Sequence, residues 1–328
     1  MVTGGTMHRF LGALLSALAL LQAPPVLAQA YPDRPVKIIV PFAPGGIADG
    51  SARVIANHLS ETWGKPFLVE NRPGAASIIA FTAVIKAPAD GYTLLYANTN
   101  IATNPSMYTN LPYDAERDLV PVALGVVTPG VIVVHPSSTA KTLSDLIALA
   151  KEKPDQLTYS SVGVGSFPHL AMEQFQQVSG TKLTHVPYKG FAPALTAVLG
   201  GEVTMLASDL QTALPHLKAG KLRALAVTAA KRMVALPDVA PVADLGLPDY
   251  EAVGWLGIMA PVGTPRDIVL KLNAEIVRGL NQPQTVARYV DNGVEVGAGS
   301  PEDFGIYIQR SRVRWSGVIK RGGIKGGG

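Results

Sequence analysis

The chain contains no cysteine among its 328 residues. Structural disulfides and thiolate metal sites are therefore excluded. A bacterial lipoprotein needs a cysteine at its cleavage site, so the sequence also predicts no lipid anchor of that kind. A secreted protein without disulfides depends on its hydrophobic core, and this chain is long enough to form two domains.

Clusters of charge of one sign are also missing. The net charge is +4, and the 28 lysines and arginines are dispersed, with no basic run longer than Lys231-Arg232. Proteins that bind nucleic acids usually gather their cations on one face. The sequence therefore argues against a nucleic-acid partner, and a small anionic ligand fits the charge balance better.

Motifs of nucleotide binding and of catalysis are not found. The sequence has neither G-x-x-x-x-G-K-[ST] nor G-x-G-x-x-G, and neither G-x-S-x-G nor H-E-x-x-H. The histidines after residue 30 show no paired metal-ligand spacing; they are His58, His135, His169, His185 and His216. We therefore expect a protein that is not an enzyme and that holds no metal and no cofactor.

One apolar run stands out, at the N-terminus. Arg9 precedes an apolar stretch from Phe10 to Leu21, and a small-x-small site follows at Ala28-Gln29-Ala30. This order is typical of a secretory signal peptide, and the run is too short to span a bilayer comfortably. We expect residues 1–30 to be removed on export. A retained anchor and a start at Met7 remain the alternatives.

Predicted strands and helices alternate through the rest of the chain. The first predicted strands cover 36–40, 67–70 and 92–97, and helices lie between them. This order predicts a mostly parallel sheet with helices on both faces. A second α/β unit is expected after Thr128-Pro129-Gly130, with no flexible linker before it. The chain is therefore expected to cross between the units more than once and to form a hinge there.

The loop of residues 41–49 is the first candidate binding segment. Its two glycines let the backbone turn tightly and approach a ligand. The helix that follows begins with unpaired N–H groups and a partial positive charge, which suits a carboxylate or a phosphate. A plain strand-to-helix turn, with an acidic cap, is the alternative. The candidate residues here are Phe42, Ala43, Gly45, Gly46, Ile47 and Asp49.

A second loop, residues 161–168, repeats this arrangement in the second unit. Ser166 is a natural N-cap and Pro168 suits a first helical turn. In open α/β sheets, ligands lie beyond the carboxyl ends of the strands, so two such loops are expected to hold one anion from both sides. His169 either reaches the ligand or bonds locally. The candidates from this loop, and from the end of the third strand, are Gly163, Gly165, Ser166, Phe167, His169, Asn98 and Thr99.

Many segments, in order, resemble one family of receptors. They include Tyr31-Pro32-Asp33-Arg34-Pro35, Pro44-Gly45-Gly46, Val69-Glu70-Asn71-Arg72-Pro73-Gly74-Ala75, Asp90-Gly91-Tyr92-Thr93-Leu94-Leu95, Leu111-Pro112-Tyr113-Asp114, His185-Val186-Pro187-Tyr188-Lys189-Gly190 and Gly220-Lys221-Leu222-Arg223-Ala224-Leu225-Ala226-Val227-Thr228. On these segments the chain resembles the Bug family, the periplasmic solute receptors of tripartite tricarboxylate transporters. The resemblance covers nearly all of the chain after residue 30.

The resemblance implies an α/β fold like the type II periplasmic binding proteins, with two α/β domains that close on a ligand cleft. Domain 1 is expected to be discontinuous, covering 31–129 and 255–328, and domain 2 to cover 130–254. The implied ligand is a small organic carboxylate, held by backbone groups of the two loops. The implied partners are the membrane permease subunits of such a transporter. A sensor kinase is the alternative partner, and a secreted hydrolase is the less favoured function.

The chain departs from the family pattern near the expected cleft. Ala76 and Ser77 stand where the family usually has glycines, and Ser77 adds a hydroxyl. The family often has Phe-Asp where this chain reads Leu206-Ala207-Ser208-Asp209. Aromatic side chains around the cleft would favour an aromatic dicarboxylate such as terephthalate, but only Phe42, Phe167 and Tyr188 are candidates for this contact. Ser77, Tyr188 and Asp209 therefore join the candidates, and the choice among di-, tri- and aromatic carboxylates stays open.

Overall fold

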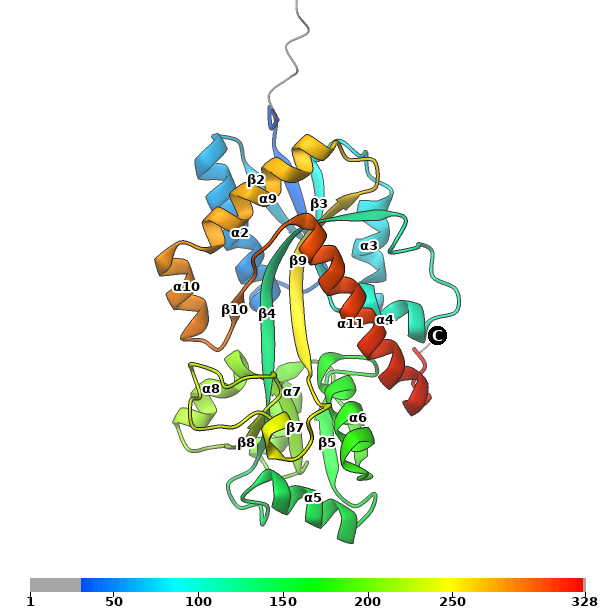
Figure 1. Ribbon diagram of the computed structural model, residues 1–328, viewed down its shortest axis with the longest axis vertical. Coiled ribbons are helices and arrows are strands. Elements are labelled where there is room, and N and C mark those ends of the chain that lie inside the picture. Colours follow the sequence, from blue (N-terminus) through cyan, green and yellow to red (C-terminus); the bar gives the residue numbers. More distant parts are fainter. Residues whose placement is uncertain (1–30, 327–328) are drawn as a thin grey trace, which may run out of the picture. The chain divides into compact units, whose positions relative to one another are not determined.

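The computed structural model describes residues 31–326, and the described residues from Arg34 onward form one compact unit (Figure 1). The predicted signal peptide, residues 1–30, lies outside the described residues. Within 31–326, no helix combines the length and the apolar character needed to cross a membrane. Everything below concerns the unit that begins at Arg34.

Ten strands make up the sheet of this unit. They are β1 (Val36–Val40), β2 (Phe67–Asn71), β3 (Thr93–Asn98), β4 (Leu119–Val134), β5 (Thr158–Ser161), β6 (Thr184–Pro187), β7 (Met205–Asp209), β8 (Arg223–Val227), β9 (Val253–Pro261) and β10 (Glu295–Val296). The strand order is β2-β1-β3-β9-β4-β7-β5-β6, and both β8 and β10 pair with β4.

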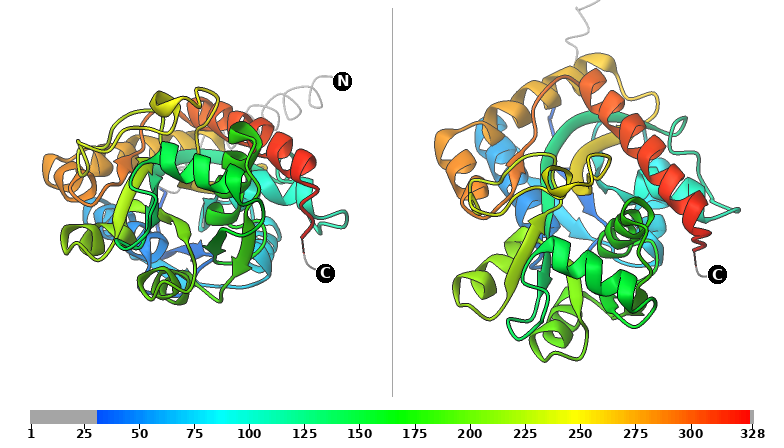
Figure 2. Two further views of the ribbon diagram at one scale, coloured as in Figure 1. Left: turned by 90° about the horizontal axis from the view of Figure 1, so that it is seen from below. Right: turned by 60° about the horizontal axis from the view of Figure 1, so that its bottom comes forward.

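Helices connect the strands and cover the sheet. They are α2 (Ile47–Trp63), α3 (Ile78–Ile85), α4 (Asn100–Met107), α5 (Leu143–Glu152), α6 (Phe167–Ser179), α7 (Phe191–Leu199), α8 (Leu210–Lys218), α9 (Arg266–Leu280), α10 (Pro283–Val290) and α11 (Pro301–Gly322). Two short 3-10 helices, η1 (Ala75–Ser77) and η2 (Ala243–Leu245), complete the described elements. Both α9 and α11 pack on β4 (Figure 2).

The sheet is mixed, so the expectation of a mostly parallel sheet holds only within two groups of strands. β1 pairs in parallel with β2 and β3, and β5 pairs in parallel with β6 and β7. β9 and β4 are antiparallel to each other. β9 is also antiparallel to β3, and β4 is also antiparallel to β7, β8 and β10. The α/β alternation predicted the two parallel groups. It did not predict the antiparallel pair that joins them.

The long strand β4 belongs to both groups. Its first part pairs with β9 from Leu119 to Pro129, and its last part, from Gly130 to Val134, pairs with β7. Figure 1 shows β4 and β9 side by side, with β1–β3 around one end and β5–β8 around the other. Gly130, where a new unit is expected to begin, thus lies inside one continuous strand of 16 residues.

Strand direction makes the carboxyl ends of the two groups face each other. β1, β2 and β3 run in the same direction as β4, and β5, β6 and β7 run against it. Asn98, the last residue of β3, lies level with Val126 of β4, because both pair with Leu256. Asp209, the last residue of β7, pairs with Gly130. Along β4, four residues separate the level of Asn98 from the level of Asp209, which is a distance of about 13 Å along the strand.

The helix α11 adds a further connection. A capping box between Ser300 and Asp303 starts it, and Gly323 in a left-handed conformation ends it. Trp315 and Val318 are buried in one hydrophobic cluster with Phe175 of α6, and the two helices lie side by side (Figures 1 and 2). Full burial of such side chains contributes about 1.5–3 kcal/mol each. The last turns of α11 are thus fixed against the second group of strands.

Candidate functional site

The first candidate loop, residues 41–46, leads from β1 into α2. Residues 43–46 are exposed, and Gly46 is the N-cap of α2 with an extended backbone. As described here, α2 has no side-chain cap, because Gly46 has no side chain to accept from the first turn. The helix start therefore keeps N–H groups available for an anion, as the sequence predicts.

Asp49 holds this loop in shape from inside. It is only 5% exposed, and its carboxylate accepts hydrogen bonds from Gly45 N (3.1 Å), Asn71 Nδ2 (3.0 Å) and Arg53 Nε (3.0 Å). The bond from Arg53 is the largest of the causes that lower the pKa of Asp49 to about 2. Asn71 also donates to the carbonyl oxygen of Phe42 (3.0 Å). The charges of Asp49 and Arg53 are thus paired with each other.

The second candidate loop, residues 162–166, joins β5 to α6 and is held by side chains on both sides. Ser161 Oγ accepts from Gly163 N (3.0 Å), and Ser166 Oγ donates to Gly163 O (2.6 Å). Gly165 N donates to His169 Nδ1 (3.0 Å). Ser166 is the N-cap of α6, as predicted, but in the described chain its side chain caps no first-turn N–H. This helix start also keeps its donors for an anion.

A buried stack of rings supports the second loop. His169 and His185 stack at 4.2 Å between ring centroids, and Tyr159 stacks on His185 at 5.0 Å. His185 Nε2 lies 2.5 Å from Ser161 Oγ. Because His169 Nδ1 accepts from a backbone N–H, this ring is neutral with its proton on Nε2, which faces Glu173 at 3.8 Å. Of the two possibilities for His169, the structure shows the local hydrogen bond.

We expect stability to fall between pH 6.5 and pH 4 because of this stack. Burial lowers the pKa of His169 and of His185 to about 4. Above pH 6.5 both are neutral in the folded and the unfolded chain. Below that value the unfolded chain takes up protons that the folded chain does not, which costs about 2–3 kcal/mol for His169 once pH 4 is reached.

Urea unfolding across this pH range measures the effect. His169→Asn should flatten the dependence on pH, whereas His135→Asn should leave it unchanged, because His135 contacts only the nearby Ser137 through its ring nitrogen. Equal slopes for the wild type and His169→Asn would contradict the assignment.

A third group of candidates gathers where β3 ends. Asn98 is buried, and its Nδ2 donates to Ser77 Oγ (3.1 Å). Thr99 Oγ1 accepts from Trp255 N (3.2 Å), which ties the start of α4 to β9. Residues 75–77 approach from the chain that follows β2. Ser77 and Asn98, which the sequence selected for separate reasons, are thus in contact.

The remaining candidates lie near the point where β4 passes between the groups. Phe167 lies against Gly130, where an added Cβ would be only 2.8 Å from the ring. Asp209 is the N-cap of α8 and accepts from Thr212 N (2.8 Å), and burial raises its pKa. Tyr188 is half-buried against the hydrophobic cluster that contains Val131, Leu206 and Leu210. Its N–H donates to Ser161 O (2.8 Å). The carboxylate of Asp209 therefore already accepts a hydrogen bond from the first turn of α8.

Several supporting residues were not among the candidates. Asn71, Arg53, Asn100 and Ser161 hydrogen-bond to candidate residues. His185 stacks on the candidate His169 and hydrogen-bonds to Ser161. Asn71 and Ser161 each end a strand, as Asn98 does. The reasoning that selected Asn98, a polar residue at the carboxyl end of a strand, finds both when it is applied to every strand.

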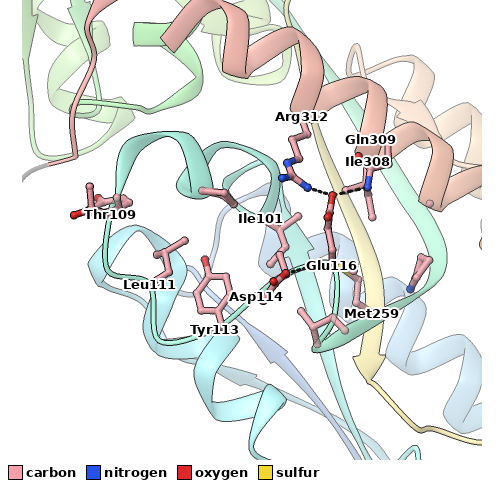
Figure 3. Close-up of a pocket in the computed structure, with 16 residues that line it drawn as sticks. Ile101, Thr109, Leu111, Tyr113, Asp114, Glu116, Met259, Ile308, Gln309 and Arg312 are labelled. Atoms are coloured by element: carbon pink, nitrogen blue, oxygen red, sulfur yellow. Dashed lines mark hydrogen bonds and ion pairs between the residues drawn. The ribbon is translucent and has the colours of Figure 1, made fainter. Parts of the chain in front are cut away.

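A cavity of about 410 Å³ lies elsewhere, between α4, the segment 108–116 and α11 (Figure 3). Glu116 spans it by accepting from Gln309 Nε2 (2.7 Å) and pairing with Arg312. None of the candidate residues lines this cavity. The cavity forms because α11 lies over α4. Ligands of open α/β sheets are expected at the carboxyl ends of the strands, and this expectation does not point to the cavity.

Acidic residues and histidines do not gather as metal ligands. Among residues 31–326, no group of three or more histidines, aspartates or glutamates is placed to hold a metal ion. The chemistry that the described site offers is hydrogen-bond donation, from two helix starts and from hydroxyl and amide side chains. Donors of this kind bind anions and hold them in place.

Comparison with known proteins agrees with this geometry. Residues 51–324 match the model of the tripartite tricarboxylate transporter family receptor. The chain belongs to this receptor family. Protein BugT of Bordetella pertussis is 37% identical over 305 residues, which cover 92% of this chain and 94% of BugT. A UPF0065 protein of Pseudomonas sp. strain P51 is 36% identical over 291 residues, or 88% and 87% of the two chains.

Solved structures give the same result. R. palustris Rpa4515 with adipate superimposes with a TM-score of 0.82 at 38% identity, covering 90% of this chain and 99% of that one. MatC from Rhodopseudomonas palustris with bound malate has a TM-score of 0.78 at 32% identity, covering 88% and 100%. The periplasmic binding protein BugD also gives 0.78 at 32% identity, covering 90% and 99%.

Membership in the family confirms three predictions from the sequence. The resemblance to the Bug family is correct, the fold is the two-domain α/β fold of these periplasmic binding proteins, and the receptor is not an enzyme. Receptors of this family bind small carboxylates and work with transporter membrane subunits. The ligand of this particular receptor and the residues that hold it remain to be proposed.

Proposed function

We propose that this receptor captures a small dicarboxylate between the first loop, residues 41–46, and the second loop, residues 162–166. One observation carries the proposal. Two sets of parallel strands point their carboxyl ends at each other, about 13 Å apart along β4, and each set ends in an uncapped helix start. The starts of α9 and α10 also lack a side-chain cap. The proposal therefore depends on the way the carboxyl ends of the two strand sets face each other, and not on the missing caps alone.

Backbone N–H groups are the proposed donors to the first carboxylate. Neither loop contains a lysine or an arginine. The nearest cations on either side of the first loop, Lys37 and Arg53, are already paired with Glu70 and Asp49. Backbone donors at helix starts satisfy an anion without the cost of desolvating a cation. Within residues 43–47 and 163–167, Pro44 has no N–H, and the N–H groups of Gly45, Gly163, Gly165 and Ser166 already donate inside the loops. The proposed donors are therefore the N–H groups of Ala43, Gly46, Ile47, Val164 and Phe167. Asp49 acts by shaping the first loop.

The ligand class rests on the relatives. Rpa4515 is a structure with adipate and MatC a structure with malate, both small dicarboxylates. Tricarboxylates and aromatic carboxylates, which the sequence leaves open, serve as alternatives in the binding test. The proposed role is uptake through the membrane subunits of a tripartite tricarboxylate transporter.

Domain closure is part of the proposal. We assign 31–129 with 255–328 to domain 1 and 130–254 to domain 2, with the hinge where β4 and β9 leave their shared pairing. The two loops then belong to different domains, so the ligand stabilises the closed form. Small-angle scattering should show a smaller radius of gyration with saturating ligand. An unchanged radius would contradict closure.

The receptor is proposed to work in the periplasm after removal of residues 1–30. The signal-like order of Arg9, the apolar run and Ala28-Gln29-Ala30 supports this. Mass spectrometry of the exported protein should give Tyr31 as the first residue. An intact chain retained in the membrane would contradict it.

Isothermal titration tests the function itself. The panel contains adipate, succinate, malate, citrate, terephthalate, the monocarboxylate hexanoate, and 1,6-hexanediol as an uncharged control. We expect at least one dicarboxylate to bind with a dissociation constant of about 1 µM or tighter, near −8 kcal/mol, and hexanediol not to bind. Tighter binding of hexanediol than of every carboxylate would overturn the proposal, and so would no binding by any compound.

A further inference from the structure

Three consecutive residues that are not glycine adopt left-handed backbone conformations between β2 and α3. The φ angles are 45° at Ala75, 47° at Ala76 and 72° at Ser77. Residues with a Cβ avoid this region because the Cβ crowds the backbone, and such strain persists only where the surroundings hold it. Glycine would take these angles without strain. The turn therefore requires a compensating network, and the structure contains one.

Asparagine amides hold the turn. Asn98 Nδ2 and Asn100 Nδ2 both donate to Ser77 Oγ, at 3.1 and 3.2 Å, and Asn104 Nδ2 donates to Ala76 O at 3.0 Å. Asn100 N donates to Asn98 Oδ1 (3.0 Å), which fixes the orientation of the Asn98 amide. Ser77 is 3% exposed and Asn98 6%. Asn98 and Asn100 thus hold Ser77, and Asn104 holds Ala76, in backbone conformations that serine and alanine disfavour.

This network decides what the hydroxyl of Ser77 offers. A serine hydroxyl has one O–H donor and two acceptor lone pairs. Two amide donors take both lone pairs. The hydroxyl can then only donate, so it favours a carboxylate or carbonyl oxygen and disfavours a ligand group that is itself a donor. Ser77 is also the N-cap of α3, and its side chain caps none of the described first-turn N–H groups of that helix.

The position suits the far end of a dicarboxylate. Ser77 is bonded to the last residue of β3, and β3 lies next to β1, which carries the first loop. Neighbouring strands are about 4.8 Å apart. The Ser77 hydroxyl therefore lies at the same carboxyl edge as the first loop, about one strand spacing away from it. This distance is within the length of a six-carbon diacid whose first carboxylate is held by the two loops.

We infer that Ser77 is a specificity-determining residue, whose hydroxyl donates to the second carboxylate of a dicarboxylate and so selects diacids over monoacids. The inference rests on the proposed function, since it needs the first carboxylate at the two loops. Asn98 and Asn100 are positioning residues that make the hydroxyl a donor. The strained turn places that donor at the carboxyl edge.

Titrations with adipate and with hexanoate test this selection, because the two differ only in the second carboxylate. In Ser77→Ala we expect adipate to bind about tenfold more weakly and hexanoate to bind as in the wild type. Ser77→Gly removes the hydroxyl and also relieves the strain, so it should show the same loss of selectivity in a chain that folds. Ala76→Gly is the matched control, which relieves strain next door and should keep the wild-type ratio.

The outcomes separate the two proposals. If the wild type binds adipate and the ratio of adipate to hexanoate affinity stays the same in Ser77→Ala and Ser77→Gly, the role of Ser77 is refuted and the proposed function stands. If both ligands weaken equally in both variants, Ser77 has only a structural role. If the wild type binds neither adipate nor hexanoate, the inference is refuted, because it needs a six-carbon diacid. The proposed function then stands or falls with the other dicarboxylates of the panel.

Discussion

Gly46→Val should abolish carboxylate binding in a protein that remains folded. The space around Gly46 is open, with no heavy atom within 4 Å of an added Cβ, and its φ of −87° with ψ of 179° suits a β-branched residue. Folding is therefore expected to be unaffected. The valine side chain would occupy the mouth of the α2 start, where the anion is proposed to lie. We expect a loss of affinity of at least a hundredfold, about 2.7 kcal/mol.

Two cation variants give the contrast for Gly46→Val. Arg53→Ala removes the first positive charge that follows the first loop in sequence, and Lys189→Ala removes the one just before the start of α7. Both side chains are exposed to solvent, so each should cost about 1 kcal/mol or less. Titration of one ligand against all three variants decides. Normal binding by Gly46→Val, with binding lost in a folded cation variant, would mean that an arginine or lysine captures the anion instead.

Asp49→Ala should weaken both the fold and the binding. The carboxylate of Asp49 accepts from Gly45 N, Asn71 Nδ2 and Arg53 Nε, and its removal leaves these donors without their acceptor inside the loop. Breaking such a buried, charge-assisted network costs about 2–4 kcal/mol of stability. Because Gly45 lies in the first loop, we also expect a tenfold or greater loss of affinity. Urea unfolding and titration measure the two effects.

The charge of Asp49 can be tested separately from its shape. Its pKa is lowered to about 2, first by the hydrogen bond from Arg53. The stability that it contributes is fully present above the unfolded value of 3.8 and is lost as the pH falls from there toward 2. Asp49→Asn keeps an acceptor oxygen and should lose less stability than Asp49→Ala at pH 7, while removing this part of the acid dependence. Wild-type affinity in Asp49→Ala would contradict its role as the anchor of the loop.

The positions of the two candidate loops could be predicted because their signals are local. Glycines between a strand and a helix, as at Gly45 and Gly46, mark the same loop in the sequence and in the structure. The position of Pro168 in the first turn of α6 was predicted for the same reason. The family resemblance gave the two-domain fold. Each of these depends on a few neighbouring residues.

The features that were not predicted depend on residues far apart in the sequence. The continuity of β4 through Pro129 and Gly130 depends on pairing with β9, more than a hundred residues later. The stacked pair of His169 and His185 requires β6 to lie beside β5. The left-handed turn at Ala76 is stabilised by Asn104, and local preference alone argues against it. Tertiary contacts override local preference in all three places.

The most direct test is a crystal structure of the receptor with the dicarboxylate that binds most tightly in titration. The account predicts one carboxylate about 3 Å from backbone nitrogens in both 43–47 and 163–167, with the two domains closed around it. A ligand bound in the cavity between α4 and α11, or held by an arginine or lysine side chain with both helix starts empty, would contradict it.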